Sequence, residues 1–238
     1  MKEMIIILAS IIILTAIILF LCNFFGLLSF YHPMKKAKEN QIRIACVGDS
    51  ITYGCMIKNR SKNNYPKILN SFLGQKYCVN NFGYTNRTAI KSADYPYVKE
   101  KLYTKSLEFN PHIVFFLLGS NDSKEKNWDK EKFIKDYKDI IDSYVNLVTS
   151  PKIYILLAPP AFQVGKKVLY QLRGDVIEKE INTAIKEITK EKKLEAIDLY
   201  EVFKNKQELF ADGVHPNAKG SKLLAQTIYT VLKNDGYN

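Results

Sequence analysis

The sequence predicts an α/β fold, namely a three-layer αβα sandwich around a five-stranded parallel sheet, preceded by an N-terminal transmembrane helix. Two observations predict the sandwich: short apolar runs bounded by turn residues, and longer segments between them whose apolar residues recur every three to four positions. Strands that alternate with helices pair in parallel and are covered on both faces. An uninterrupted apolar stretch near the N-terminus predicts the membrane helix.

The N-terminal apolar stretch covers residues 4–31 and carries no charge; its polar interruptions are Ser10, Thr15, Asn23 and Ser29. As a helix it would measure roughly 40 Å at ~1.5 Å per residue, which spans a bilayer with some tilt. The apolar region of a cleaved signal peptide covers about 7–15 residues and ends at a small-x-small site, which the sequence lacks before Lys35. We therefore expect a single-pass anchor that is not cleaved.

The charges that flank this stretch favour a cytoplasmic domain when they are taken alone. Lys35, Lys36 and Lys38 follow the stretch, whereas Lys2 and the amino terminus precede it. Positively charged flanks tend to stay in the cytoplasm, but this tendency weakens for long translocated domains. The flanks therefore leave the side of the membrane open.

A polar linker at residues 32–41 separates the anchor from the domain, which we place at residues 42–238. Five apolar runs are expected to form the strands, and they are Ile42–Val47, Tyr77–Phe82, Ile113–Leu118, Ile153–Leu157 and Ala196–Leu199. Helical periodicity covers residues 129–148, 175–190 and 218–232. The polar segments 59–65 and 159–174 are long enough to shape a substrate cleft.

The composition limits the partners and cofactors of the domain. The formal charge of +11 comes mainly from scattered lysines, and no segment interleaves aromatic with basic residues, so nucleic acid is not expected as a partner. The lysines fit either a solvated surface or attraction to an anionic membrane face. Cys46, Cys55 and Cys78 form neither an even set nor a C-x-x-C pair, so we expect free thiols. Nothing in the sequence implies a metal or an organic cofactor.

A candidate catalytic serine follows the first predicted strand. Ser50 stands at a strand-to-loop corner after Gly48, and open α/β folds bind ligands at the carboxyl edge of the sheet. Serine is a weak nucleophile without a base, and the base that we expect is His215. Asp212 lies three residues before it and can fold back onto the imidazole, although the same loop could simply lead into a helix. Ser50, His215 and Asp212 are therefore the predicted triad.

Hydrolysis of an ester through an acyl-serine also needs hydrogen-bond donors for the tetrahedral oxyanion. Gly83 and Asn121 follow the next two predicted strands, so we expect both at the same sheet edge as Ser50. The predicted donors are the backbone N–H groups of Ser50 and Gly83 and the side-chain amide of Asn121. Either residue alone would be an ordinary turn residue, and their convergence favours a shared role.

Together these segments resemble the SGNH (GDSL-type) hydrolase family over residues 42–235. The likeness is carried by Ser50, Gly83, Asn121 and His215. The resemblance implies the flavodoxin-like strand order 2-1-3-4-5 and ester hydrolysis through an acyl-serine. Because relatives with an N-terminal hydrophobic segment typically act outside the cell, it also implies an extracytoplasmic domain.

Within this family the chain resembles most the sialate O-acetylesterase-like, carbohydrate-deacetylating branch. The matching segments are residues 81–83 with Thr88, residues 95–97, residues 119–124 with Trp128, and residues 159–162. The likeness implies that Trp128 offers an aromatic face to a sugar ring, although packing at the start of the next helix is equally compatible. Tyr84 and Asn86 replace the small residues of many relatives, and we expect Tyr84 to shape the acyl pocket.

The sequence therefore predicts a membrane-anchored serine esterase that removes short acyl groups, above all acetyl, from a glycan or a small-molecule ester. Two alternatives stay open. One is a lysophospholipase or thioesterase that acts on lipid acyl esters, and the other is a glycan-binding envelope protein without turnover. Activity that rises from acetyl to octanoyl esters would favour the lipid enzyme.

Overall fold

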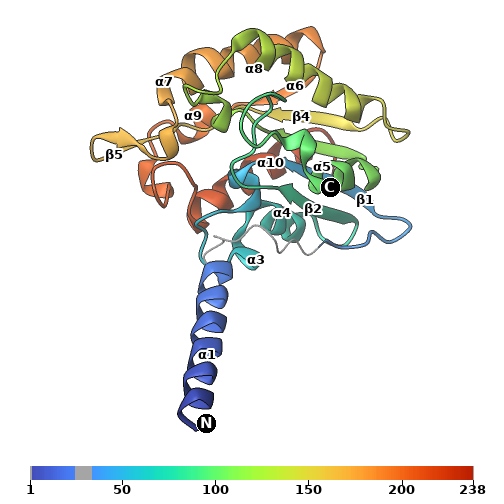
Figure 1. Cartoon of the computed structure of the whole chain (residues 1–238). Coiled ribbons are helices and arrows are strands. Elements are labelled where there is room, and N and C mark those ends of the chain that lie inside the picture. Colours follow the sequence, from blue (N-terminus) through green and yellow to red (C-terminus); the bar gives the residue numbers. More distant parts are fainter. Residues whose placement is uncertain (1, 25–33, 238) are drawn as a thin grey trace.

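The computed structural model describes residues 2–24 and 34–237. The strands of its main sheet are all parallel and are β1 (Ile42–Gly48), β2 (Tyr77–Gly83), β3 (Ile113–Leu117), β4 (Lys152–Leu156) and β7 (Glu195–Ile197). They lie in the order β2-β1-β3-β4-β7, which confirms the predicted order (Figure 1). Every predicted strand is present, and the ends differ from the predicted ends by one or two residues.

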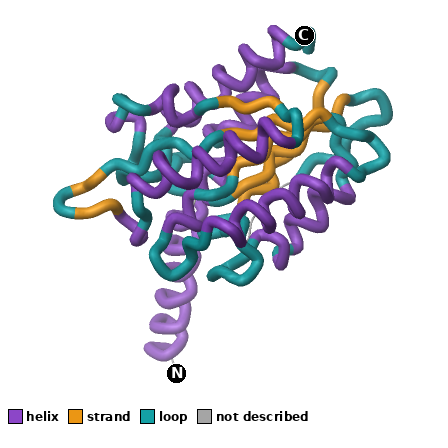
Figure 2. The backbone as a smooth tube through the Cα atoms, turned by 90° about the horizontal axis from the view of Figure 1, so that it is seen from above, coloured by secondary structure: helices purple, strands orange, loops and turns teal. Residues whose placement is uncertain are grey.

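Helices cover both faces of this sheet, so the predicted three-layer sandwich is confirmed (Figure 2). One face packs against α5 (Lys101–Glu108), α6 (Lys130–Val145), α7 (Gly174–Val176) and α8 (Asn182–Glu191). The other face packs against α4 (Tyr65–Leu73), α9 (Leu199–Phe203) and α10 (Ala218–Asn234). Each face has its own apolar core because successive side chains of a buried strand point to opposite sides of the sheet.

The helix predicted at residues 175–190 is present but irregular. It consists of α7, a π-helical turn at Ile177–Ile181, and α8. Directly after the π-helical turn, the Asn182 side-chain amide accepts a hydrogen bond from the Ala158 N–H and donates one to the Ala158 carbonyl, both at 2.9 Å. The irregular helix therefore holds the chain where it leaves β4, next to the carboxyl edge of the sheet.

Several short elements were not predicted as regular structure. They are α2 (Ser50–Tyr53), α3 (Arg60–Asn63), α4, α5, α9, and an antiparallel hairpin of β5 (Gln163–Val164) and β6 (Lys167–Val168). The hairpin lies within the polar segment 159–174, and α3 lies within the polar segment 59–65. Both segments thus contain local structure where the sequence indicated only irregular chain.

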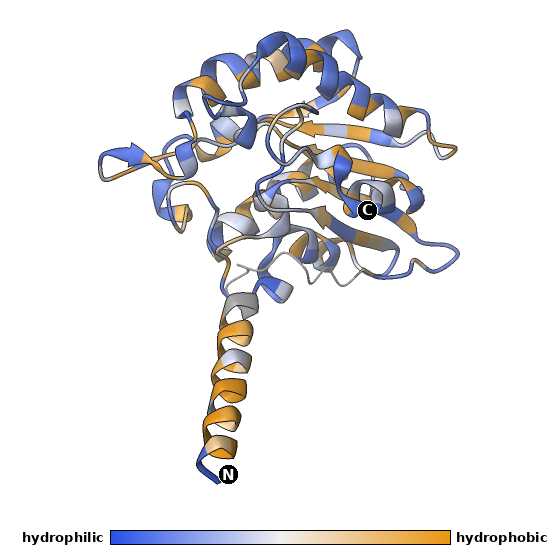
Figure 3. Ribbon diagram, viewed as in Figure 1, coloured by the Kyte–Doolittle hydropathy of each residue, from blue (hydrophilic) through white to orange (hydrophobic). Residues whose placement is uncertain are grey.

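The N-terminal helix α1 (Lys2–Phe24) agrees with the predicted membrane helix as far as the structure describes it. The segment Lys2–Leu21 is long and apolar enough to cross a membrane, and none of its residues is buried within the protein. Figure 3 shows apolar residues along most of this helix. A signal sequence near an N-terminus meets the same criteria. Residues 25–31 of the predicted anchor lie outside the described residues, as do the first two residues of the predicted linker.

The described part of the linker is fastened to the sheet. Residues 34–41 contain no helix or strand. The Asn80 side chain in β2 accepts a hydrogen bond from the Lys35 N–H and donates one to the Lys35 carbonyl, both at 2.9 Å. Asn80 thereby fixes the point at which the chain reaches the domain.

Candidate active site

Ser50 begins α2 directly after β1, as the predicted strand-to-loop corner requires. The Asp49 side chain caps this short helix by accepting a hydrogen bond from the Ile51 N–H at 2.9 Å. A Cβ at Gly48 would lie 2.3 Å from Thr52 Oγ1 and 2.4 Å from the Leu117 carbonyl oxygen, so only glycine fits between β3 and the new helix. The tight turn raises the Ser50 hydroxyl at the carboxyl edge of the sheet.

The loop before α10 brings a base to this hydroxyl. His215 Nε2 lies 2.9 Å from Ser50 Oγ, and His215 Nδ1 lies 2.7 Å from Asp212 Oδ2. Asp212 Oδ1 also accepts the backbone N–H groups of Val214 and His215, at 3.0 and 2.7 Å. Asn217 caps α10 directly after the loop. The loop therefore leads into α10 and also holds the Asp212 carboxylate against the His215 imidazole. The three residues of the predicted triad lie in contact.

The electrostatics of Asp212 fix the role of each imidazole nitrogen. Burial alone would raise the pKa of Asp212, but hydrogen bonds from His215 and the Tyr170 hydroxyl, together with the charge of His215, hold that pKa well below its ordinary value. A carboxylate that stays ionised can only accept, so His215 Nδ1 donates to it. Nε2 then presents its lone pair to the Ser50 hydroxyl.

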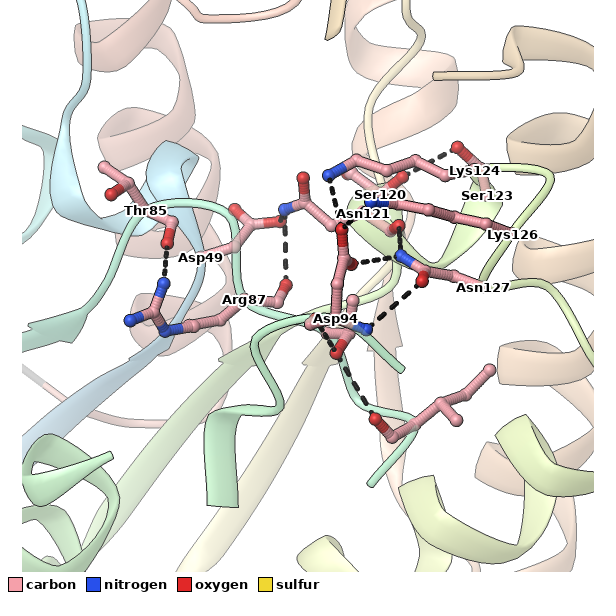
Figure 4. Close-up of polar contacts among 12 residues, drawn as sticks. Asp49, Thr85, Arg87, Asp94, Ser120, Asn121, Ser123, Lys124, Lys126 and Asn127 are labelled. Atoms are coloured by element: carbon pink, nitrogen blue, oxygen red, sulfur yellow. Dashed lines mark hydrogen bonds and ion pairs between the residues drawn. The ribbon is translucent and has the colours of Figure 1, made fainter. Parts of the chain in front are cut away.

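Asn121 stands in a 3₁₀ turn at Ser120–Ser123, directly beyond β3. Its side-chain amide donates to Asp49 Oδ2 at 3.3 Å and to the Arg87 carbonyl at 3.2 Å (Figure 4). Both contacts are at the long end of the range for N–H···O hydrogen bonds. Asn127 holds the main chain here, because its amide donates to the Asn121 carbonyl at 3.0 Å. The Asn121 side chain is thus positioned but only weakly engaged.

Two buried carboxyls lie around this turn in a different electrostatic state from Asp212. Burial raises the pKa of Asp49 to about 6 and that of Asp122 to about 7, although hydrogen bonds from backbone N–H groups oppose both shifts. Asp122 accepts the N–H groups of Ala89 and Ile90 at 2.9–3.0 Å. It therefore ties the loop after β2 to the turn that carries Asn121.

The structure does not bring the Gly83 N–H to the site, and that prediction is corrected. Gly83 is the last residue of β2, and its N–H donates to the Asn81 side chain at 2.9 Å. A Cβ at Gly83 would lie 2.2 Å from the Tyr53 nitrogen and 2.6 Å from the Thr52 carbonyl carbon. Glycine is required here because the backbone of α2 packs directly against the strand, rather than because its N–H faces a ligand.

Asn86, and not Gly83, is the residue after β2 that lies at the cavity beside Ser50. Asn86 lines the cavity at Ser50, and its φ of 64° is in the left-handed region that asparagine tolerates better than most residues. Among the described residues, the Asn86 N–H has no hydrogen-bond acceptor. The sequence signal was an asparagine soon after a strand, which by itself is typical of any turn.

The two predicted substrate-binding aromatics do not line this cavity. Trp128 packs against Phe133 with ring centroids 5.4 Å apart, and its Nε1–H donates to Glu180 at 2.7 Å. Tyr84 is covered by the Arg87 guanidinium, which lies 4.0 Å above its ring. Trp128 therefore has the helix-packing role that the sequence left open, and neither ring lines the cavity at Ser50, so their contact with a substrate stays a prediction.

The cavity at Ser50 is small and closely enclosed. Its volume is about 10 Å³, and its lining includes Ser50, Asn86, Asn121, Tyr170 and His215. Ser50 and His215 are only 7% and 5% exposed, so both side chains are shielded from bulk water. Within residues 2–24 and 34–237, no group of three or more His, Cys, Asp and Glu side chains is arranged to hold a metal ion.

Comparison with known proteins extends these observations. The model of the GDSL-like lipase/acylhydrolase family matches residues 46–223. An acetylxylan esterase from Xylanibacter ruminicola is 35% identical over 215 residues, which cover 82% of this chain and 44% of that protein. The chain thus spans less than half the length of this relative.

Solved structures of esterases share the fold at low sequence identity. A carbohydrate acetylesterase from Sinorhizobium meliloti has a TM-score of 0.65 at 16% identity and covers 82% of this chain and 99% of its own. The M. smegmatis aryl esterase has a TM-score of 0.66 at 16% identity and covers 81% of this chain and 98% of its own. The family match covers most of the domain, including the loops of Ser50 and His215, and the chain belongs to the GDSL-like lipase/acylhydrolase family.

Proposed function

We propose that the chain is a serine esterase that removes short acyl groups, above all acetyl, from carbohydrate through an acyl-serine intermediate. The observation that carries the proposal is the continuous hydrogen-bond chain from Ser50 through His215 to Asp212 beside a small enclosed cavity. Family membership supports acyl hydrolysis, and the name of the acetylxylan esterase relative supports acetyl groups on carbohydrate.

In the proposed reaction, His215 Nε2 takes the proton of the Ser50 hydroxyl while Ser50 Oγ attacks the acyl carbon. Asp212 stabilises the imidazolium that forms. His215 then protonates the leaving alcohol as its bond to the acyl carbon breaks, which leaves an acyl-serine. A water molecule, deprotonated by His215, attacks this ester, and the returning proton restores Ser50 and releases the carboxylic acid.

The proposed oxyanion donors are the N–H groups of Ser50 and Asn86 and the amide of Asn121. Asn86 offers an N–H without an acceptor in the described part of the chain, at the cavity wall. Asn121 must exchange one of its long contacts, and the 3.3 Å contact to Asp49 is the longer of the two. Hydrogen bonds of this kind often shorten only when the substrate is bound.

The cavity favours a short acyl group over a lipid chain. A volume of about 10 Å³ accommodates roughly one water-sized group, which matches the methyl of an acetyl ester. With p-nitrophenyl esters of two, four and eight carbons, we expect kcat/KM to fall at least about tenfold from acetyl to butyryl. A steady rise towards octanoyl would instead establish the lysophospholipase or thioesterase alternative.

Replacement of Ser50 by alanine tests the mechanism directly. The full chain in detergent is expected to hydrolyse p-nitrophenyl acetate and to react with a fluorophosphonate probe, and Ser50→Ala is expected to do neither. Ser61→Ala is the matched control, because Ser61 is an exposed serine of α3. Equal labelling of Ser50→Ala and wild type would refute the serine mechanism, and an inactive wild type would favour the glycan-binding alternative.

We further propose that residues 4–31 anchor the protein in a membrane with its domain outside the cytoplasm. The apolar helix α1 supports an anchor, and the resemblance to extracytoplasmic relatives supports this side of the membrane. Acetylated glycans of a cell surface or a medium would then lie within reach of the domain. Release of acetate from a panel of acetylated sugars and xylan, measured with the full chain, tests the carbohydrate class.

A further inference from the structure

The chain between β4 and α7 crosses the proposed active site as a strap, which we define as residues 162–173. At its start, the Phe162 N–H donates to the Gly213 carbonyl in the loop of the triad at 2.8 Å. At its end, the Arg173 N–H donates to Ser123 Oγ at 3.1 Å, and Arg173 Nε donates to the Ser123 carbonyl at 2.6 Å. The strap therefore joins the loop of Asp212 and His215 to the turn of Asn121.

Tyr170 is the residue of the strap that reaches the triad. Its hydroxyl donates to Asp212 Oδ2 at 2.7 Å, and its ring meets the His215 imidazole edge to face with centroids 5.2 Å apart. Tyr170 and Gln171 both have φ of 60°, a left-handed conformation that bulky L-residues rarely adopt. Strained conformations of this kind concentrate at functional sites, and here the strain turns the Tyr170 side chain towards Asp212.

The Tyr170 hydroxyl and the His215 imidazole share one carboxylate oxygen. Asp212 Oδ2 accepts from Tyr170 at 2.7 Å and from His215 Nδ1 at 2.7 Å. A second donor on that oxygen draws off part of its negative charge, so less of this charge stabilises the imidazolium. The neutral imidazole, which is the form that accepts the Ser50 proton, is correspondingly favoured.

We propose that Tyr170 is a positioning residue that tunes the basicity of His215 through Asp212, and this rests on the proposed esterase function. Tyr170 does not exchange a proton with substrate. It orients the carboxylate by its hydroxyl and limits how strongly the carboxylate holds a protonated imidazole. The strap thereby extends the triad by one donor.

Other titratable and charged groups face the same atoms and stay in place when Tyr170 is changed. The charge of Asp49 acts on His215, Cys55 lies close enough to act on Asp212 and Tyr170, and Lys124 acts on Asp49. Removal of the Tyr170 hydroxyl alone leaves the electrostatic effects of these other groups unaltered. A change in the protonation of His215 in that variant is therefore due to the lost donor.

Tyr170→Phe in the full chain in detergent tests the proposal, because it removes the hydroxyl and keeps the ring on His215. For p-nitrophenyl acetate we expect the acid limb of kcat/KM to move to higher pH by about half a unit, since the imidazolium is better stabilised. The plateau of kcat should fall about tenfold because Asp212 loses one of its orienting bonds. Tyr229→Phe is the matched control, because Tyr229 lies in α10 and its ring packs on Phe72 of α4.

An NMR titration of the imidazoles supplies a readout that needs no turnover. The chain has three histidines, so the signal of His215 can be assigned with His112→Gln and His32→Gln variants. Its titration midpoint is expected to rise in Tyr170→Phe, and Tyr170→Leu gives the same test should the first variant fold poorly. An unchanged or lower midpoint overturns the proposal. An inactive wild type with the expected NMR shift would overturn the esterase function and leave the Tyr170 inference intact.

Discussion

The surroundings shift the pKa values of single carboxyl groups of the site in opposite directions. Asp212 is stabilised as a carboxylate by four donors, two of them backbone N–H groups. Asp49 and Asp122 are more deeply buried, and burial raises the pKa of each. A raised pKa couples the stability of the fold to pH, and the sign of this coupling can be measured.

For Asp122, stability is expected to decrease as the pH rises. The folded protein keeps the Asp122 proton up to a pKa of about 7, whereas the unfolded chain releases it near the ordinary aspartate pKa of 3.8. Between these values the unfolded state binds fewer protons, so the free energy of unfolding falls as pH rises. Asp122→Asn removes this contribution, and its Tm by circular dichroism should fall less than that of wild type between about pH 5 and about pH 8. Parallel curves for Asp122→Asn, wild type and the exposed control Glu187→Gln would contradict a raised pKa of Asp122 in the folded protein.

The proposed role of the Asn86 N–H depends on its left-handed backbone. Asn86→Gly adopts a positive φ without strain and keeps the N–H, so its kcat/KM should stay within about threefold of wild type. Asn86→Val keeps the N–H but disfavours this conformation, and we expect a loss of about tenfold or more in kcat. Steady-state kinetics with p-nitrophenyl acetate measure both. Equal activity of the two variants would show that the conformation of Asn86 does not matter.

The sequence identified the side chains of the site better than its backbone donors. Ser50, His215 and Asp212 could be named because only a few residue types can act as nucleophile, base and orienting carboxylate. A backbone N–H is present at almost every residue, so its direction cannot be deduced from residue type. Gly83 was predicted as an oxyanion donor because it is a glycine after a strand. The structure requires glycine at this position because the backbone of α2 packs directly against it. The role of Tyr170 also depends on a strap conformation that no pattern indicates.

At the level of elements, α2 and β2 depend on each other through this contact. The backbone nitrogen of Tyr53 and the carbonyl carbon of Thr52 occupy the space that a side chain at Gly83 would need. The helix that carries Ser50 therefore rests on the last residue of the neighbouring strand. A change in β2 should disturb the nucleophile even though no side chain of β2 lines the cavity.

Gly83→Ala is expected to destabilise the protein by about 3 kcal/mol or more and to abolish most activity, because α2 must move. Gly165→Ala in the hairpin is the matched control. A Cβ at Gly165 meets nothing within 4 Å, and only its φ of 66° is unfavourable, so a cost of about 1 kcal/mol is expected. Chemical denaturation monitored by circular dichroism gives both values. A mild effect of Gly83→Ala would mean that α2 can shift without consequence.

Elements with long apolar patterns were predicted well, and the short ones were not. The five strands and three main helices each bury a continuous face in one of the two cores. Segments such as α2, α9 and the hairpin contain two to five residues, too few to show a period. The π-helical turn at Ile177–Ile181 differs from an α-helix by one residue in its hydrogen bonding, which leaves the apolar spacing almost unchanged.

At the scale of the whole molecule, a basic domain follows a long apolar helix. The formal charge is +11, and the apolar side chains of residues 4–21 in α1 are exposed. An anionic membrane face attracts each nearby lysine by about 1 kcal/mol, which would add to the hydrophobic insertion of the helix. The fold and the apolar helix were predictable because they depend on composition and period. The side of the membrane was not, because the flanking charges and the family resemblance disagree.

The proposed anchor makes a testable statement about the intact protein in cells. The full chain should remain in the membrane fraction after alkaline carbonate extraction, and mass spectrometry should recover a protein that still contains residues 2–24. Deletion of residues 2–31 should release it. A mature protein that begins beyond residue 31 would show that the apolar stretch is a cleaved signal sequence.

Trp128 gives the molecule a built-in optical reporter. It is the only tryptophan of the chain, and its indole is held between Phe133 of α6 and Glu180 in the π-helical turn. Its fluorescence emission therefore records the contact between these two helices. Loss of that contact would be visible without an attached dye.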